Sequence, residues 1–142
     1  MRFMIILKSD ENTEGGQQPT EQELVEMGNF NEELVKAGVM LAGEGLLPSS
    51  KGARVKFSGG ATTVLDGPFS ETKELIAGFW LIQTKTRDEA VEWVKRVPMS
   101  PDTETEIEIR QVAEAEDFGD AYTPDVREQE DRVRAQAEAN QQ

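Results

Sequence analysis

Apolar and polar positions follow two periods along the chain, which predicts a mixture of strands and helices. Residues 2–7 and residues 78–83 are apolar runs of strand length, typical of central strands. Residues 105–110 alternate strictly between polar and apolar side chains, as half-exposed strands do. A fourth strand begins at residues 39–42, and the glycines and Pro48 that follow are expected to bend or end it.

Two helices are expected between these strands. A capping box begins at Thr20, and apolar residues then recur at helical spacing. Gly38 is well placed to cap the end of this helix, which is predicted to span about residues 20–37. A second capping box begins at Thr86 and opens a helix that Pro98 stops.

Turns and loops connect these elements. Residues 8–19 are polar and are expected to form a loop, whereas residues 53–57 and 62–65 predict a β-hairpin with one face exposed to water. Asp66-Gly67-Pro68 is a cluster of turn residues, because Asp can bond its downstream backbone, Gly accepts a positive φ and Pro fixes φ at about −65°. This turn places a carboxylate at a strand end, and one helical turn follows it.

The order of elements is strand, helix, strand, hairpin, strand, helix, strand. Without the hairpin it contains two βαβ-like halves, which predicts a ferredoxin-like α+β fold with an inserted β-hairpin. Two helices cover only one face of a four-stranded sheet. A second subunit is the simplest cover for the other face, so a homodimer is expected.

The domain is expected to span residues 1–112, because the composition changes beyond them. Residues 113–142 contain nine Asp or Glu and three Arg. Within them, residues 124–142 have only Val126 and Val133 as large apolar side chains. Helix propensity and charge pairs without an apolar face predict an acidic, marginally helical C-terminal tail.

Charge and composition narrow the choice of partners. The chain has 28 acidic and 15 basic residues, a formal net charge of −13, so it would repel a phosphate backbone and no nucleic-acid partner is expected. No apolar run approaches the roughly 18 residues that span a membrane, and the short N-terminal run does not have the pattern of a signal peptide. The absence of Cys is consistent with a reducing compartment. A cytoplasmic, soluble protein without a membrane partner is expected.

The 142 residues include neither His nor Cys. This excludes a Ser-His-Asp triad, a Cys-His pair and a thiolate nucleophile, and it removes the usual zinc ligands. No metal and no cofactor are expected. Any chemistry must use carboxylates, Lys, Arg, Tyr122 or backbone groups, and acid–base work near neutral pH would require burial to raise a carboxylate pKa or lower a Lys pKa.

Two carboxylates are candidate general acids or bases. Asp66 lies in the turn, where the alternative is that it only accepts backbone hydrogen bonds. Glu44 lies between two glycines on a mostly apolar strand, and a buried Glu must be paired or protonated. The alternative for Glu44 is a side chain that points to solvent at a bulge.

Four further residues near the turn are candidate ligand contacts: Phe69, Glu71, Lys73 and Trp80. The alternative for Lys73 is a solvated helical turn. The aromatic pair, Phe69 and Trp80, has the alternative of a place in the core or in a dimer interface, where aromatic side chains are common.

The segment Asp66-Gly67-Pro68-Phe69, followed by Glu71, Lys73-Glu74 and Gly78-Phe79, resembles the signature of the DGPF family, a branch of the YCII-related proteins. The stretch from Leu41 to Leu46, with Pro48, also resembles that family's pattern. The similarity covers about residues 1–112.

This resemblance implies a dimeric ferredoxin-like α/β barrel with two sheets packed face to face. Some YCII-related proteins have a His-Asp pair in a cleft, and only the Asp is carried over here, with Asp66 as its best candidate. The resemblance also implies a regulatory context, because DGPF members are often encoded beside alternative sigma factors.

Three functions agree with these observations. The first is a dimeric small-ligand-binding or regulatory module with a cleft near the turn at residues 66–69. The second is a small cofactor-free enzyme in which Asp66 or Glu44 acts as general acid or base. The third is a purely structural interaction protein. The sequence leaves the question of catalysis open.

Overall fold

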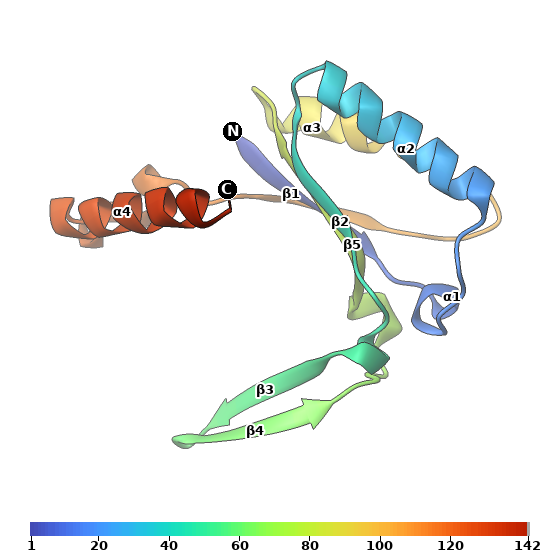
Figure 1. Ribbon diagram of the computed structural model, residues 1–142, viewed down its shortest axis with the longest axis horizontal. Helices are drawn as coiled ribbons and strands as arrows, with labels where there is room; N and C mark the ends of the chain where they lie inside the picture. The colour runs from blue at the N-terminus through green and yellow to red at the C-terminus, as the bar shows by residue number, and fades with distance from the viewer. Residues whose placement is uncertain (142) are drawn as a thin grey trace. The chain divides into compact units, whose positions relative to one another are not determined.

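The computed structural model of the chain describes residues 1–141. The chain divides into two compact units, Met1–Gln111 and a second unit that begins at Val112. The first unit contains six strands, three α-helices and two short 3₁₀ turns (Figure 1). In chain order these are β1 (Arg2–Lys8), α1 (Glu11–Glu14), α2 (Glu21–Lys36), β2 (Met40–Gly45), η1 (Ser49–Lys51), β3 (Ala53–Ser58), β4 (Ala61–Asp66), η2 (Thr72–Glu74), β5 (Ile76–Gln83), α3 (Arg87–Val94) and β6 (Ile107–Gln111).

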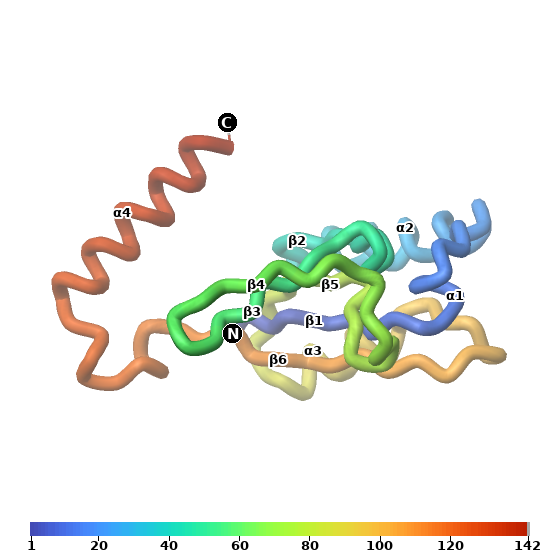
Figure 2. Tube along the Cα trace, turned by 90° about the horizontal axis from the view of Figure 1, so that it is seen from below, coloured from blue at the N-terminus to red at the C-terminus, as the bar shows by residue number. Residues whose placement is uncertain are grey.

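Four strands form one antiparallel sheet in the order β2-β5-β1-β6, and Figure 2 shows β5, β1 and β6 side by side. The central strands β1 and β5 are the two apolar runs that were expected at the centre. The chain passes from β1 to β2 through α2 and from β5 to β6 through α3. The predicted ferredoxin-like α+β topology is therefore confirmed. The hairpin β3–β4 is inserted between β2 and β5 as a separate two-stranded sheet.

The helices α2 and α3 pack on one face of the four-stranded sheet (Figure 1). Ile5 on β1 lies opposite both Trp80 on β5 and Ile109 on β6, and paired residues of antiparallel strands share a face. These side chains pack with α2 and α3 in a single apolar cluster. Its buried members are Phe3, Ile5, Phe30, Leu34, Val39, Trp80, Ile82, Ala90 and Val97.

The opposite face of the sheet also carries apolar side chains. Met4 and Ile6 on β1 lie opposite Leu81 and Phe79 on β5. Met4 is 37% exposed and the other three are partly exposed. Because α2 and α3 pack on the other face, neither helix covers this surface.

The helix α2 begins and ends as its sequence predicts. Thr20 Oγ1 accepts a hydrogen bond from the Glu23 backbone N–H at 3.1 Å, and Glu23 Oε1 accepts one from the Thr20 backbone N–H at 3.4 Å. Gly38 has a φ of 71°, the left-handed conformation that favours glycine just beyond a helix end. Both predictions, the capping box at Thr20 and Gly38 at the end of the helix, are confirmed.

At α3, half of the expected capping box is present. Thr86 Oγ1 accepts from the Glu89 backbone N–H at 3.1 Å, as predicted. The Glu89 carboxylate, however, accepts from the backbone N–H of Lys85 at 3.0 Å and not from that of Thr86. The reciprocal bond is displaced by one residue, so it stabilises the turn before the helix.

Two connecting segments differ from their predictions. The expected loop at residues 8–19 contains the short helix α1, because Asp10 accepts a hydrogen bond from the Thr13 backbone N–H at 2.7 Å and caps its start. The hairpin was expected to expose one face, yet every residue of β3 and β4 is exposed, and Phe57 retains 78% of its accessible surface. Within residues 1–141 its strands pair only with each other, and the exposure of all their residues shows that no second layer from these residues covers either face.

The second unit consists of a kinked 3₁₀ segment, η3 (Ala115–Ala121), and the helix α4 (Pro124–Asn140). No residue of α4 is buried. The unit is held together locally, because the Tyr122 hydroxyl donates to Glu130 Oε2 at 2.7 Å and the Tyr122 ring stacks on Phe118 with 5.6 Å between centroids. Residue 142, the last of the predicted tail, lies outside the described residues.

Candidate functional site

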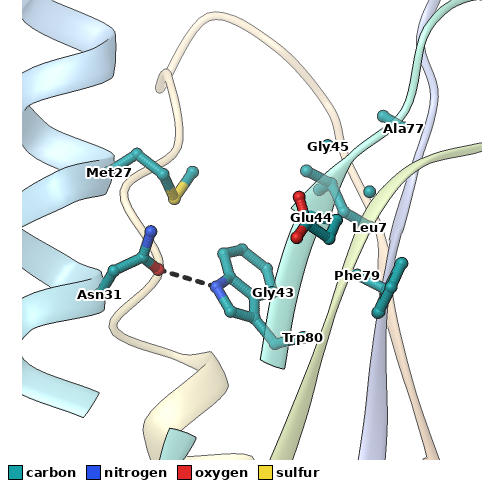
Figure 3. A pocket seen from close by; sticks show the side chains of 10 residues that line it. Leu7, Met27, Asn31, Gly43, Glu44, Gly45, Ala77, Phe79 and Trp80 are labelled. Carbon is teal, nitrogen blue, oxygen red and sulfur yellow. Dashed lines mark hydrogen bonds between the residues drawn. The ribbon is translucent and has the colours of Figure 1, made fainter. Parts of the chain in front are cut away.

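A pocket of about 210 Å³ lies between α2 and the strands β2 and β5 (Figure 3). Met27 and Asn31 of α2 form one wall, and Trp80 of β5 projects toward them. Leu7, residues 43–45 and residues 77–79 complete the lining on the sheet side. The crossover from β1 to β2 through α2 creates this arrangement, because it places one helix above an edge strand and its neighbour.

Two glycines keep the sheet side of the pocket closely packed. A Cβ on Gly43 would lie 2.7 Å from the Met40 Cε and 2.9 Å from the Trp80 Cδ1. A Cβ on Gly78 would lie 2.9 Å from the Glu44 backbone oxygen. Real Cβ atoms do not approach other atoms so closely, so glycine lets the indole lie against β2 and lets β2 lie against β5.

Trp80 is held in place by burial, a hydrogen bond and a ring contact. It is 6% exposed, its Nε1–H donates to Asn31 Oδ1 at 2.8 Å, and its ring meets Phe30 edge-on with 5.7 Å between centroids. The bond uses the amide oxygen of Asn31. It leaves the Asn31 NH₂ group without a hydrogen-bond partner among residues 1–141, and so available to a ligand.

Glu44 lines the same pocket from the edge strand β2. It is exposed, and its carboxylate makes no hydrogen bond or ion pair with the described part of the chain. Its register partner is Phe79, on the face opposite Trp80, so Glu44 borders the pocket from the edge of the sheet. The structure therefore brings together Glu44 and Trp80, two of the residues selected from the sequence.

Asp66 lies elsewhere, as the last residue of β4. It is exposed and is not among the described residues that line this pocket. Its carboxylate makes neither an ion pair nor the expected local hydrogen bond to the downstream backbone within residues 1–141. The turn at residues 66–69 is held by other groups.

Ser49 and Glu14 hold that turn. The Phe69 backbone N–H donates to Ser49 Oγ at 3.0 Å. Ser49 in turn donates its backbone N–H to Glu14 Oε2 at 3.0 Å and its hydroxyl to Glu14 Oε1. A Cβ on Gly67 would lie only 1.8 Å from the Ser49 backbone oxygen, so only glycine fits there. Sequence reasoning missed this network because Glu14 and Ser49 are far apart in the chain.

The other candidate ligand contacts are dispersed. Phe69 lies beneath the Arg54 guanidinium, 3.8 Å from the ring centroid, which occupies one face of the ring. Glu71 immediately precedes η2, Lys73 lies within it, and both are exposed. Lys73 lines a second pocket, separate from the one at Trp80.

Two carboxylates with a lowered pKa, Glu108 and Glu130, lie outside the pocket. On β6, Glu108 accepts a hydrogen bond from Arg110 at 3.1 Å and pairs with Lys8 at 3.5 Å, and both contacts lower the pKa of Glu108. In the second unit, the Tyr122 hydroxyl and then the Arg134 guanidinium lower the pKa of Glu130. The same hydrogen bond raises the pKa of Tyr122.

Neither a metal site nor a membrane span is found within residues 1–141. No group of three or more acidic side chains is arranged to hold a metal ion in that range. None of the helices there has the length and apolar character needed to cross a bilayer.

The model of the YCII-related domain family matches residues 1–116 of the chain. An uncharacterised protein of Rhizobium meliloti (strain 1021) is 30% identical over 115 residues, which are 80% of this chain and 93% of that protein. The solved structure of 5-chloro-2-hydroxyhydroquinone dehydrochlorinase (TftG) from Burkholderia phenoliruptrix AC1100, in complex with 2,5-dihydroxybenzoquinone, is also similar. That comparison has 15% identity and a TM-score of 0.45, and it covers 82% of this chain and 98% of TftG. The family match and the relative show that this chain belongs to the YCII-related domain family.

Proposed function

We propose that the chain binds a small organic ligand in the pocket between α2 and the strands β2 and β5. The observation that supports this is the meeting of Trp80, Asn31 and Glu44 around one cavity. Ligand sites in proteins combine mostly apolar walls with a few well-placed polar groups. Here Leu7, Met27 and the indole supply the apolar surface.

The polar groups define the kind of ligand. The Asn31 NH₂ group is a hydrogen-bond donor and the Glu44 carboxylate is an acceptor. The ligand is therefore a compact, partly apolar molecule with a hydroxyl or amino group for Glu44 and an acceptor for Asn31. Aromatic alcohols and amines with one or two rings have this chemistry and suit a cavity of about 210 Å³.

The ligand-binding unit is proposed to be a homodimer. Met4, Ile6, Phe79 and Leu81 form an apolar face on the sheet that α2 and α3 do not cover. A second copy of the same face would bury it in an isologous contact. A dimer of this kind would carry two pockets, one on the helix side of each sheet.

A thermal-shift screen tests the binding proposal. A ligand that binds only the folded state raises Tm, and the stabilisation grows with the logarithm of the ligand concentration once that concentration exceeds Kd. We expect a Tm increase with compact aromatic alcohols or amines in the wild type and a smaller one in Glu44→Gln. Glu32→Gln, an exposed residue of α2, is the matched control. A Tm that no member of the screen changes would favour a purely structural interaction protein.

Catalysis by Glu44 is the second candidate function. Of the two carboxylates proposed from the sequence, Glu44 lines the pocket and Asp66 does not. A carboxylate in contact with a bound ligand can act as general base or acid. The test is turnover of a ligand from the screen as a function of pH. Glu44→Gln is expected to retain binding of the ligand's apolar part and to lose turnover, whereas Asp66→Asn is expected to retain both.

A further inference from the structure

We propose that a second pocket of the first unit binds a free α-amino acid in its zwitterionic form. This pocket has a volume of about 210 Å³ and lies where the end of β1, the turn η2 and the segment before β6 meet. Its described lining residues are Lys8, Ser9, Lys73, Glu104, Thr105 and Glu106, none of which lines the pocket at Trp80.

Ser9 provides the first reason. It is 8% exposed, and its backbone N–H donates to the Leu75 backbone oxygen at 2.9 Å. Its hydroxyl is buried and has no hydrogen-bond partner among residues 1–141. Buried hydroxyl groups in folded proteins are almost always paired, so a water molecule or a ligand group is expected as the partner of Ser9 Oγ.

Two lysines line the pocket together with Ser9. Lys8 is partly buried, with 22% of its side chain exposed, and it pairs with Glu108 at 3.5 Å. Lys73 is exposed and makes no ion pair within the described part of the chain. A hydroxyl and two ammonium groups are all able to donate hydrogen bonds to a carboxylate.

Two carboxylates line the pocket as well. Glu104 and Glu106 are exposed and make no ion pair with the described residues, and the Glu106 backbone oxygen accepts from the Lys8 backbone N–H at 3.2 Å. That backbone bond holds the acidic segment beside the end of β1. The pocket therefore presents both signs of charge, and its carboxylates would repel an anion of charge −2 such as phosphate.

A ligand with one ammonium and one carboxylate group complements both signs of charge in this pocket. Its carboxylate would be bound by Ser9 Oγ and the ammonium groups of the two lysines. Its ammonium group would be bound by Glu104 and Glu106. An α-amino acid has this chemistry, and a cavity of about 210 Å³ suits one amino acid better than a peptide.

Isothermal titration of the full-length protein with L-alanine, propionate, ethylamine and inorganic phosphate tests the proposal. L-Alanine contains both charged groups, whereas propionate and ethylamine each contain one. We expect L-alanine to bind at least ten times more tightly than either single-charge compound. Equal affinity for propionate, tighter binding of phosphate, or no binding of L-alanine would each overturn the proposal.

Three variants separate a site from a general charge effect. Ser9→Ala and Lys73→Met are each expected to weaken L-alanine binding at least tenfold, and Glu106→Gln is expected to act in the same direction. Lys56→Met, which removes an exposed lysine of the hairpin, is the matched control and should leave binding unchanged. If Ser9→Ala does not fold, the affinity of Lys73→Met for L-alanine still tests the proposed site. Equal effects of Lys73→Met and Lys56→Met would contradict the site.

Discussion

The indole Nε1–H of Trp80 donates a hydrogen bond to Oδ1 of Asn31 across 2.8 Å, which connects the central strand β5 to the helix α2. Because Trp80 is 6% exposed, this bond satisfies a donor that water cannot reach easily. It also fixes the orientation of the ring that forms one wall of the pocket. The same pair of residues therefore contributes to stability and shapes the proposed binding site.

Replacing Asn31 by Leu is expected to lower the free energy of unfolding by about 1–3 kcal/mol, because a buried N–H group loses its partner. Urea denaturation measures this change. Asn31→Asp keeps an acceptor oxygen and should cost less. Asn29→Leu, an exposed change on the same helix, serves as the control and should remain within about 0.5 kcal/mol of wild type. Equal effects at positions 29 and 31 would show that the hydrogen bond contributes nothing.

The glycine at position 43 should tolerate no side chain. Gly43→Ala is expected to reduce stability by about 1–3 kcal/mol, because its Cβ would collide with Met40 and with the indole of Trp80. Gly45→Ala is the matched control on the same strand, since a Cβ there meets nothing within 4 Å. Chemical denaturation of the two variants compares them directly. A Gly43→Ala variant as stable as Gly45→Ala would contradict the close approach of β2 and Trp80.

The turn at residues 66–69 is expected to depend on Ser49 more than on Asp66. Ser49→Ala removes the acceptor of the Phe69 backbone N–H and one bond to Glu14, and it should cost about 1 kcal/mol or more. Asp66→Ala should stay within about 0.5 kcal/mol, because its carboxylate makes no such bond with residues 1–141. Thermal melts of the two variants measure the difference. A larger loss for Asp66→Ala would restore the original interpretation of the turn.

The hydrogen bond between Tyr122 and Glu130 predicts a pH dependence of the second unit. The Tyr122 hydroxyl, followed by Arg134, lowers the pKa of Glu130 below its ordinary value. The stabilisation by this pair is therefore complete above the ordinary carboxyl pKa and is lost as the pH falls through the lowered value. Carbon-13 NMR of the Glu130 carboxyl group in the full chain follows the titration. Tyr122→Phe should shift its midpoint upward, and an unchanged midpoint would contradict the interaction.

Much of the fold could be predicted from local patterns. The capping box at Thr20, the glycine at position 38 and the apolar runs of β1 and β5 are signals contained in a few neighbouring residues. The order of the elements then restricted the sheet to a ferredoxin-like topology. The short helix after β1 was missed because a polar segment that begins with a capping Asp resembles a loop.

The candidate site was less predictable, because it depends on contacts between distant segments. Glu44 and Trp80 were selected from the sequence for unrelated reasons, and both border one cavity only because β2 and β5 are neighbouring strands of the folded sheet. Asn31 and Met27 were not selected, since on a helix they fit a partly buried surface as well as a ligand contact. The importance of Ser49 was hidden for the same reason, because its partners are 35 and 20 residues away.

The most direct test of the account is a proton–nitrogen NMR titration of the protein with a ligand found in the thermal-shift screen. Trp93→Phe identifies the Trp80 indole resonance by removing the other indole signal. We predict that the ligand shifts the Trp80 indole N–H and the Asn31 side-chain NH₂, while the backbone signals of Asp66 and Phe69 remain in place. Shifts confined to residues 66–69, with the Trp80 indole unchanged, would contradict the account.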